Sequence, residues 1–148
     1  MQAAEMITAP KIAILAALLA ASPIVAECGE WNTSRDVIAA KATDRYKSAI
    51  EKCLSRSDMF PACLKEQFRT EAITLEAVYK SSLEQLQSSP DEIVTLRASQ
   101  EAWTQFQQAN CTFARSVAPT RAGDRVFQDC LLRSTSERIA ELSSLVGD

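Results

Sequence analysis

Four cysteines set within a helical hydrophobic pattern constrain the fold of this chain more than any other feature. Cys53 and Cys63 lie ten residues apart, where one helical pattern ends and the next begins. Cys111 and Cys130 flank the only long loop that we expect, between the last two helical patterns. Disulfides at such connections stabilise small exported domains. We therefore expect an all-α fold, a small disulfide-stapled bundle of about four helices.

The first 26 residues have the layout of a secretory signal peptide. Lys11 supplies a positive charge, residues 12–20 form an unbroken apolar run, and small residues follow as far as Ala26. The run is shorter than the roughly 20 apolar residues that span a bilayer. We therefore expect cleavage after Ala26 and a periplasmic or secreted protein, rather than a buried N-terminal helix or an uncleaved anchor. A lipid anchor on Cys28 is disfavoured, because Glu27 stands where a lipoprotein signal has a small residue.

The mature chain that we expect, residues 27–148, is a single domain with a core of its own. The whole chain has a formal net charge of −3, and loss of the signal peptide removes one base and one acid. A mildly acidic domain is a poor candidate for binding nucleic acid, because that binding depends on basic contacts to phosphate. Its charge would instead steer it towards a cationic protein partner.

Apolar residues at steps of three and four predict four amphipathic helices. They cover approximately residues 36–54, 61–87, 90–118 and 125–146. Glycine occurs three times in the whole chain, and no segment alternates long enough to predict a strand. Thr33 with Asp36 resembles a capping box before the first helix, and Ser89 with Pro90 marks the start of the third. The short connection between the second and third helices predicts that they are antiparallel neighbours.

Paired cysteines are expected in an oxidising compartment. Five cysteines allow several pairings, and the sequence alone does not choose among them. Proximity favours pairs at 53 with 63 and at 111 with 130, which leaves Cys28 unpaired. A zinc or redox site is the alternative, but the chain has no histidine and no C-x-x-C motif. We expect structural disulfides, no metal and no cofactor.

Residues that would indicate an enzyme are missing from the sequence. Without histidine there is no Ser-His-Asp or Cys-His arrangement, and neither G-x-S-x-G nor a phosphate-binding glycine loop is present. Acidic pairs such as Glu71 with Glu76, or Asp91 with Glu92, are more simply solvated helix faces and caps. Nothing singles out two carboxylates that face each other across a cleft. We expect no catalytic residues and no enzymatic activity.

One combination of spacings is more specific than any single motif. Gln100 stands three residues before Trp103, and Cys111 follows the tryptophan by eight residues. The pattern closes with C-L-x3-T-x2-R from Cys130 to Arg138. Together with the first cysteine pair, this combination resembles the LprI-type lysozyme inhibitor family, small exported bacterial helical proteins. The resemblance covers about residues 53–142.

The resemblance implies a disulfide framework and an activity. The implied disulfides are Cys53–Cys63 and Cys111–Cys130. The implied activity is inhibition of lysozyme-like muramidases, and we expect it to act by binding and occluding the cleft of the enzyme. The alternative is a non-enzymatic protein of the cell envelope, with a structural role or with another periplasmic partner.

The chain departs from the family pattern in two places. Many members carry Arg-Asp directly after the aromatic residue at the position of Phe106, where this chain has Gln107 and Gln108. A partner contact made by that Arg-Asp pair would be lost here. Residues 28–50 lie outside the resemblance.

The segment from Ala114 to Asp129 is the predicted loop between the last two helices, and it is our candidate surface for a partner. Lysozymes are often cationic and cleave polysaccharide with two carboxylates, so an acidic bundle would be attracted and an arginine could pair with a carboxylate. An ordinary connecting loop is the alternative. The charged residues of this candidate partner-binding loop are Arg115, Arg121, Asp124 and Arg125.

The remaining patterned residues are expected inside the bundle. Tyr79, Trp103 and Phe106 are predicted to be core aromatic residues. Buried polar groups need partners and can fix the register of helices, and a surface binding role is the alternative for such groups. The residues that we expect to form a buried polar and aromatic network are Gln100, Trp103, Thr135 and Arg138.

Overall fold

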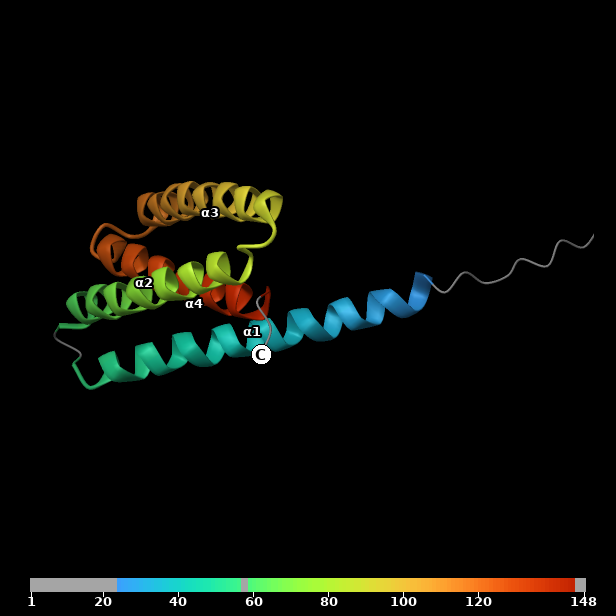
Figure 1. Cartoon of the computed structure of the whole chain (residues 1–148). Coiled ribbons are helices and arrows are strands. Elements are labelled where there is room, and N and C mark those ends of the chain that lie inside the picture. Colours follow the sequence, from blue (N-terminus) through green and yellow to red (C-terminus); the bar gives the residue numbers. More distant parts are fainter. Residues whose placement is uncertain (1–23, 57–58, 146–148) are drawn as a thin grey trace, which may run out of the picture.

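Four helices make up the structure, a computed structural model that describes residues 24–56 and 59–145, with the backbone alone for residues 24–34. They are α1 (Ile24–Leu54), α2 (Phe60–Gln85), α3 (Pro90–Val117) and α4 (Gly123–Leu145), and the described residues contain no strand (Figure 1). The prediction of a four-helix, all-α fold is confirmed. The predicted signal peptide lies outside the described residues, except for residues 24–26, which belong to α1.

The start of α1 is the largest error among the predicted helix boundaries. α1 begins at Ile24 and continues through Thr33 and Asp36, so the predicted capping box at these residues is wrong. After Pro23 this part of the chain contains no proline and a single glycine, Gly29, so nothing ends or interrupts the helix. The other three helices begin and end within a few residues of the predicted positions.

The start of α3 shows how a proline can replace a side-chain cap. Ser89 occupies the N-cap position, as predicted, but its side chain makes no capping hydrogen bond. Pro90 follows as the first helical residue, with Asp91 and Glu92 in the first turn. Proline has no N–H that would need a partner, and the two acids are favoured at the positive end of the helix dipole.

α4 is the central helix, because it packs against each of the other three helices. The backbones of α2 and α3 approach α4 more closely than they approach each other. The two helices run in opposite directions, as predicted (Figure 1). Each of them packs mainly against α4 and only slightly against the other. This position explains why α4 has more buried residues than any other helix has among the described residues. They are Gly123, Cys130, Leu131, Leu132, Thr135, Ser136, Arg138, Ile139, Ala140 and Leu142.

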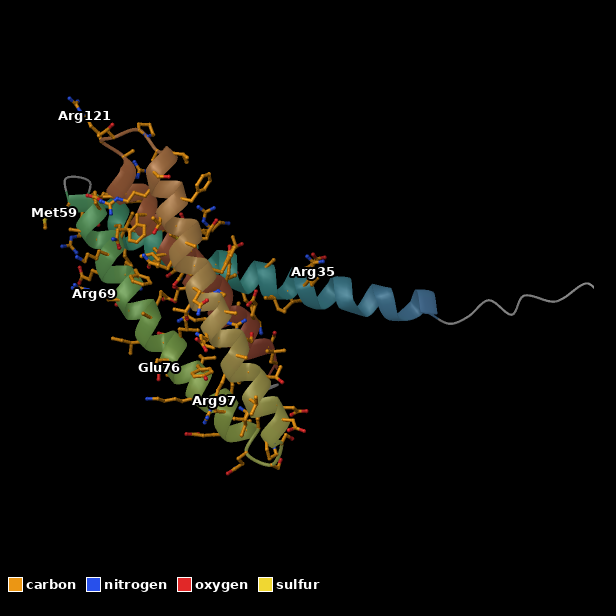
Figure 2. The ribbon with its side chains drawn as sticks, turned by 90° about the horizontal axis from the view of Figure 1, so that it is seen from above. Arg35, Met59, Arg69, Glu76, Arg97 and Arg121 are labelled. Atoms are coloured by element: carbon orange, nitrogen blue, oxygen red, sulfur yellow. A yellow bond between two sulfur atoms is a disulfide. The ribbon has the colours of Figure 1, made fainter. Side chains whose placement is uncertain are left out.

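Only the second half of α1 belongs to the bundle. Described residues 35–41 are exposed, apart from the half-buried Ile38, and full burial begins at Ala42 and continues with Ala49 and Cys53. The first half of α1 extends past the bundle as a projecting arm, which carries Arg35 (Figure 2). No helix among the described residues is long and apolar enough to cross a membrane.

The two ends of the bundle are built differently. The stapled end, as we name it, carries the α1–α2 connection and the α3–α4 turn, residues 118–122 (Figure 1). The open end carries the α2–α3 turn, residues 86–89. Both predicted disulfides lie towards the stapled end, whereas an apolar cluster of Leu75, Leu96, Ile139 and Leu142 lies towards the open end.

Candidate functional site

Both connections at the stapled end are closed by disulfides. Cys53–Cys63 joins the end of α1 to the start of α2, with 5.6 Å between Cα atoms, and Cys111–Cys130 joins α3 to α4, with 5.5 Å. All four cysteines are buried. The pairing is the one that the resemblance implies. The side chain of Cys28 lies outside the described residues.

The candidate loop from Ala114 to Asp129 is mostly helix, so these bounds are wrong, whereas the predicted ends of the two flanking helices, at about 118 and 125, are close to those observed. Only residues 118–122 connect Val117, the last residue of α3, to Gly123, the first residue of α4. Pro119 ends α3 as expected, but Gly123 begins a helix instead of extending a loop. A Cβ atom at position 123 would lie 3.4 Å from Cγ of Arg115, which is close to van der Waals contact, so α4 starts directly against the end of α3.

Two of the candidate charges hold the short turn in place. The Nη2 atom of Arg115 lies 2.7 Å from Oδ1 of Asp124, an ion pair between the last turn of α3 and the first turn of α4. The Arg115 guanidinium also lies 5.7 Å from the centre of the Phe127 ring. Both partners of the ion pair are largely exposed, so it positions the turn more than it stabilises the fold.

Arg125 links the start of α4 to the start of α2 at the stapled end. Its guanidinium lies 4.9 Å from the centre of the ring of Phe60, the first residue of α2. Arg121 is the candidate that remains. It projects from the tip of the α3–α4 turn and forms no ion pair with any described residue (Figure 2).

The predicted polar network divides into two clusters, of which the first surrounds Arg138. This arginine is 8% exposed. Its Nε donates to Oε1 of Gln100 at 3.0 Å, its Nη2 donates to Oγ of Ser99 at 2.9 Å, and its Nη1 donates to Oε2 of Glu141 at 3.1 Å. The guanidinium lies 5.9 Å from the centre of the Trp103 ring. Three of the four predicted members, Gln100, Trp103 and Arg138, therefore lie together.

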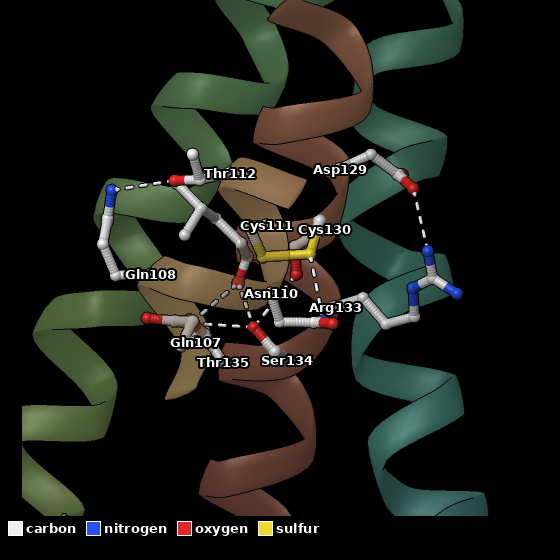
Figure 3. Close-up of a disulfide and its surroundings, with 11 residues drawn as sticks. Gln107, Gln108, Asn110, Cys111, Thr112, Asp129, Cys130, Arg133, Ser134 and Thr135 are labelled. Atoms are coloured by element: carbon white, nitrogen blue, oxygen red, sulfur yellow. Dashed lines mark hydrogen bonds and ion pairs between the residues drawn. A yellow bond between two sulfur atoms is a disulfide. The ribbon is translucent and has the colours of Figure 1, made fainter. Parts of the chain in front are cut away.

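Thr135 belongs to a second cluster, built around Gln107. The buried Nε2 atom of Gln107 lies 2.8 Å from Oγ of Ser134 and 2.9 Å from Oγ1 of Thr135 (Figure 3). Gln108, in contrast, is exposed and reaches only Thr112 on its own helix. The side chain of Gln107, one of the two residues that replace the Arg-Asp pair of the family, thus joins α3 to α4 beside the Cys111–Cys130 disulfide.

A family model matches residues 53–142, more than half of the chain, and it is described as lysozyme inhibitor LprI. The chain belongs to the LprI family. The match begins at the first cysteine of the stapled end and ends at Leu142 in the core of the open end. It therefore covers α2, α3 and nearly all of α4, and it leaves the projecting arm outside. No curated protein and no solved structure gives a significant match.

The helical positions of the LprI pattern explain why Gln107 is buried. Trp103, Gln107 and Cys111 are separated by steps of four, so they lie on one stripe of α3 that faces α4. This stripe was the signal that could have identified Gln107 as an interior residue.

The prediction that Phe106 is a core residue is wrong, because its side chain is largely exposed. Trp103 and Tyr79 are half-buried and pack against the open-end cluster. α3 packs mainly against one neighbour, α4, so only one narrow stripe of α3 is covered. Phe106 lies outside that stripe.

A groove of about 390 Å³ is lined by residues of α1 and α4, and the pKa values of two of them, Tyr46 and Glu137, are raised. Tyr46 donates a hydrogen bond to Oδ1 of Asp129 at 2.5 Å. Burial of its hydroxyl, together with this bond, raises the pKa of Tyr46 to about 12. Burial also raises the pKa of the Glu137 carboxyl, and Glu141 adds to this while Arg133 opposes it. Among the described residues, no group of three or more His, Cys, Asp or Glu side chains could hold a metal ion.

Proposed function

We propose that this protein is an exported inhibitor of lysozyme-like muramidases, which binds the enzyme and occludes its cleft. The observation that carries the proposal is the match of residues 53–142 to the LprI family. The two disulfides support export, because such bonds form and persist in oxidising compartments. The net charge of −3 supports a cationic partner, towards which the inhibitor would be steered.

The α3–α4 turn at the stapled end is the part that we propose to enter the cleft. A muramidase cleaves its substrate with two carboxylates, and a guanidinium can bind a carboxylate through two parallel hydrogen bonds. Arg121 is available for this role, because Arg115 and Arg125 already contact neighbouring side chains. Of the three candidate arginines, Arg121 is therefore the one that we propose to bind a carboxylate. Arg115 and Arg125 position the turn that carries it.

The rigidity of the turn favours tight binding. The Cys111–Cys130 disulfide and the Arg115–Asp124 ion pair hold the turn from both sides. A segment that is already ordered loses less conformational entropy when it binds than a mobile loop does. Inhibition by occlusion requires this positioning alone, and it needs no catalytic group and no cofactor.

A cell-wall lysis assay tests the proposed activity. Oxidised protein, produced by secretion so that both disulfides form, is titrated against several lysozymes at low and at physiological salt. We expect inhibition that saturates near one inhibitor per enzyme and persists at physiological salt. Absent inhibition, or inhibition that disappears with salt, would favour the alternative, an envelope protein with another partner.

Replacement of Arg121 tests the role of the turn. We expect Arg121→Ala to weaken inhibition by about tenfold or more, because a desolvated charge pair is lost. Arg97→Ala is the matched control, since Arg97 is an exposed arginine of α3 on another part of the bundle (Figure 2). If both variants inhibit as the wild type does, the turn is not the inhibitory element.

A further inference from the structure

α3 carries an apolar stripe that the described residues of the other helices leave largely exposed. Phe106, Phe113 and Val117 are 64%, 65% and 66% exposed. Their steps of seven and four residues place them on one side of the helix. Single exposed apolar residues are ordinary, but two phenylalanines and a valine in one row form a patch of the kind that marks interaction sites.

The part of the chain that carries this stripe contains no acidic residue. No Asp or Glu occurs in residues 102–123, although the chain has 19 of them among 148 residues. The only charges in this segment are Arg115 and Arg121. The segment that carries the stripe is therefore neutral to basic on an acidic protein, and the next acid, Asp124, is paired with Arg115.

The stripe is continuous with the proposed inhibitory turn. Val117 is the last residue of α3, and the turn with Arg121 at its tip follows directly. Because Phe113 lies one helical turn before Val117, the apolar row leads from the middle of α3 to the stapled end. If the turn entered an enzyme cleft, the stripe would therefore lie against the wall of the same cleft.

The chemistry of a muramidase cleft fits such a face. Two carboxylates operate in the cleft, so an acidic docking surface would be repelled. In lysozyme, an apolar pocket surrounds the carboxyl that acts as the general acid. The surface that fits this cleft is apolar, carries no carboxylate and has a cation at its leading edge.

We propose that the stripe of Phe106, Phe113 and Val117 docks against the apolar wall of a carboxylate-containing enzyme cleft, while Arg121 reaches the carboxylates. This inference rests on the proposed function, and it adds the docking face. Aromatic residues and arginine carry much of the binding energy in protein interfaces. Phe113, which lies in the middle of the row, is the expected anchor.

A pair of opposite charges at one position provides the test. Phe113→Glu and Phe113→Lys both remove the ring, but only glutamate adds a negative charge facing the enzyme carboxylates. Ile73→Glu on α2 is the matched control, because Ile73 is an equally exposed apolar residue outside the acid-free segment. Affinity for the lysozyme is measured by calorimetry and inhibition by the lysis assay, with melting curves to confirm that each variant is folded.

We expect Phe113→Glu to weaken binding by about thirtyfold, Phe113→Lys by about fivefold, and Ile73→Glu by less than about twofold. If the wild type inhibits and Phe113→Glu inhibits equally well, the stripe is not the docking face, and the proposed function stands without it. Equal losses for glutamate and lysine would overturn the carboxylate-facing orientation. If the wild type binds no lysozyme, the proposed function fails, and this inference fails with it.

A second copy of the chain is the competing occupant of the stripe, and light scattering detects it. If Phe113→Glu converts a wild-type dimer to a monomer without changing inhibition, the stripe is a self-association surface and the inference is wrong. A wild type that stays monomeric while Phe113→Glu loses affinity for the enzyme supports it.

Discussion

The stapled end and the open end of the bundle solve the same problem by different means. At the stapled end, two disulfides and the contacts of Arg115 and Arg125 hold two connections. At the open end, the α2–α3 turn has backbone hydrogen bonds such as Ser89 N–H to Leu86 O at 2.7 Å, above a cluster of leucines. Both ends therefore present short turns, but covalent bonds hold the helices only at the stapled end, whereas packing and backbone hydrogen bonds are sufficient at the open end.

Removal of both disulfides has the largest effect that we expect. Each closes a loop of 10 or 19 residues, for which chain entropy predicts about 3 kcal/mol of stability, so the loss of both approaches the whole stability of a small domain. Serine substitutions of each pair, followed by urea unfolding, measure the two contributions. The Cys111–Cys130 pair should contribute about 0.6 kcal/mol more, because its loop is roughly twice as long. Unchanged unfolding midpoints would show that the stapled end does not depend on its bridges.

Truncation of the open-end core comes second. Leu142→Ala should lower the free energy of unfolding by about 3 kcal/mol, because it leaves a cavity at a fully buried position beside Leu75, Leu96 and Ile139. Hydrogen exchange should then accelerate at the open end more than near the disulfides. Leu145→Ala on the same helix is the control, since Leu145 is exposed and should change stability by less than about 0.5 kcal/mol. Equal effects of the two substitutions would contradict the packing described for this end.

Removal of the buried guanidinium is the third test. Arg138→Ala should cost about 2 kcal/mol, because Gln100 loses its partner and Trp103 loses packing. The control is Arg133→Ala, which removes an exposed arginine from an ion pair with Asp129 and should cost only a few tenths of a kcal/mol. Thermal melts of the two variants compare them directly. An unchanged melting temperature in Arg138→Ala would mean that the cluster around Arg138 does not stabilise the bundle.

The smallest expected effect concerns Tyr46, which packs near the first disulfide. Tyr46→Phe removes the hydrogen bond to Asp129 and should cost about 1 kcal/mol at neutral pH. The pKa of Tyr46 is raised from 10.0 to about 12, so the folded state holds this proton more tightly than the unfolded state does. The stabilisation is therefore complete below pH 10 and is lost as the pH rises through about 12.

Urea unfolding of wild type and Tyr46→Phe from pH 8 upward measures this difference. The stability advantage of the wild type should be greatest below pH 10 and should shrink as the pH rises above 10. A difference that stays constant across this range would mean that the Tyr46 hydroxyl does not titrate as its surroundings imply.

Local patterns in the sequence were sufficient for the helices and for the disulfides. Steps of three and four between apolar residues reflect the period of an α-helix, so they located α2, α3 and α4. Paired cysteines close to one another in the chain need little tertiary information. The projecting arm of α1 was missed because a sequence that permits a helix carries no mark of where its packing partners end.

Exposure and polar partners depend on tertiary packing, which the sequence does not state. Phe106 and Gln107 are adjacent, yet the phenylalanine is exposed and the glutamine is buried, because α3 contacts mainly one helix. A rule that places aromatic residues inside fails at such a position. The loop around Arg121 was overestimated for a related reason, since Gly123 indicates a turn locally but begins a helix once α3 lies beside it.

The length of α1 also affects which cysteines pair when the chain is oxidised. Each bridge joins a cysteine to the next one along the chain, with Cys28 as the one possible wrong partner from the N-terminal side. Once α1 is helical, the sequence separation of 25 between Cys28 and Cys53 holds their backbones about 38 Å apart. A disulfide requires Cα atoms within about 7 Å, so a continuous helix prevents this mispairing without any contact to the rest of the protein. The arm thereby acts as a spacer that leaves Cys53 free to pair with Cys63.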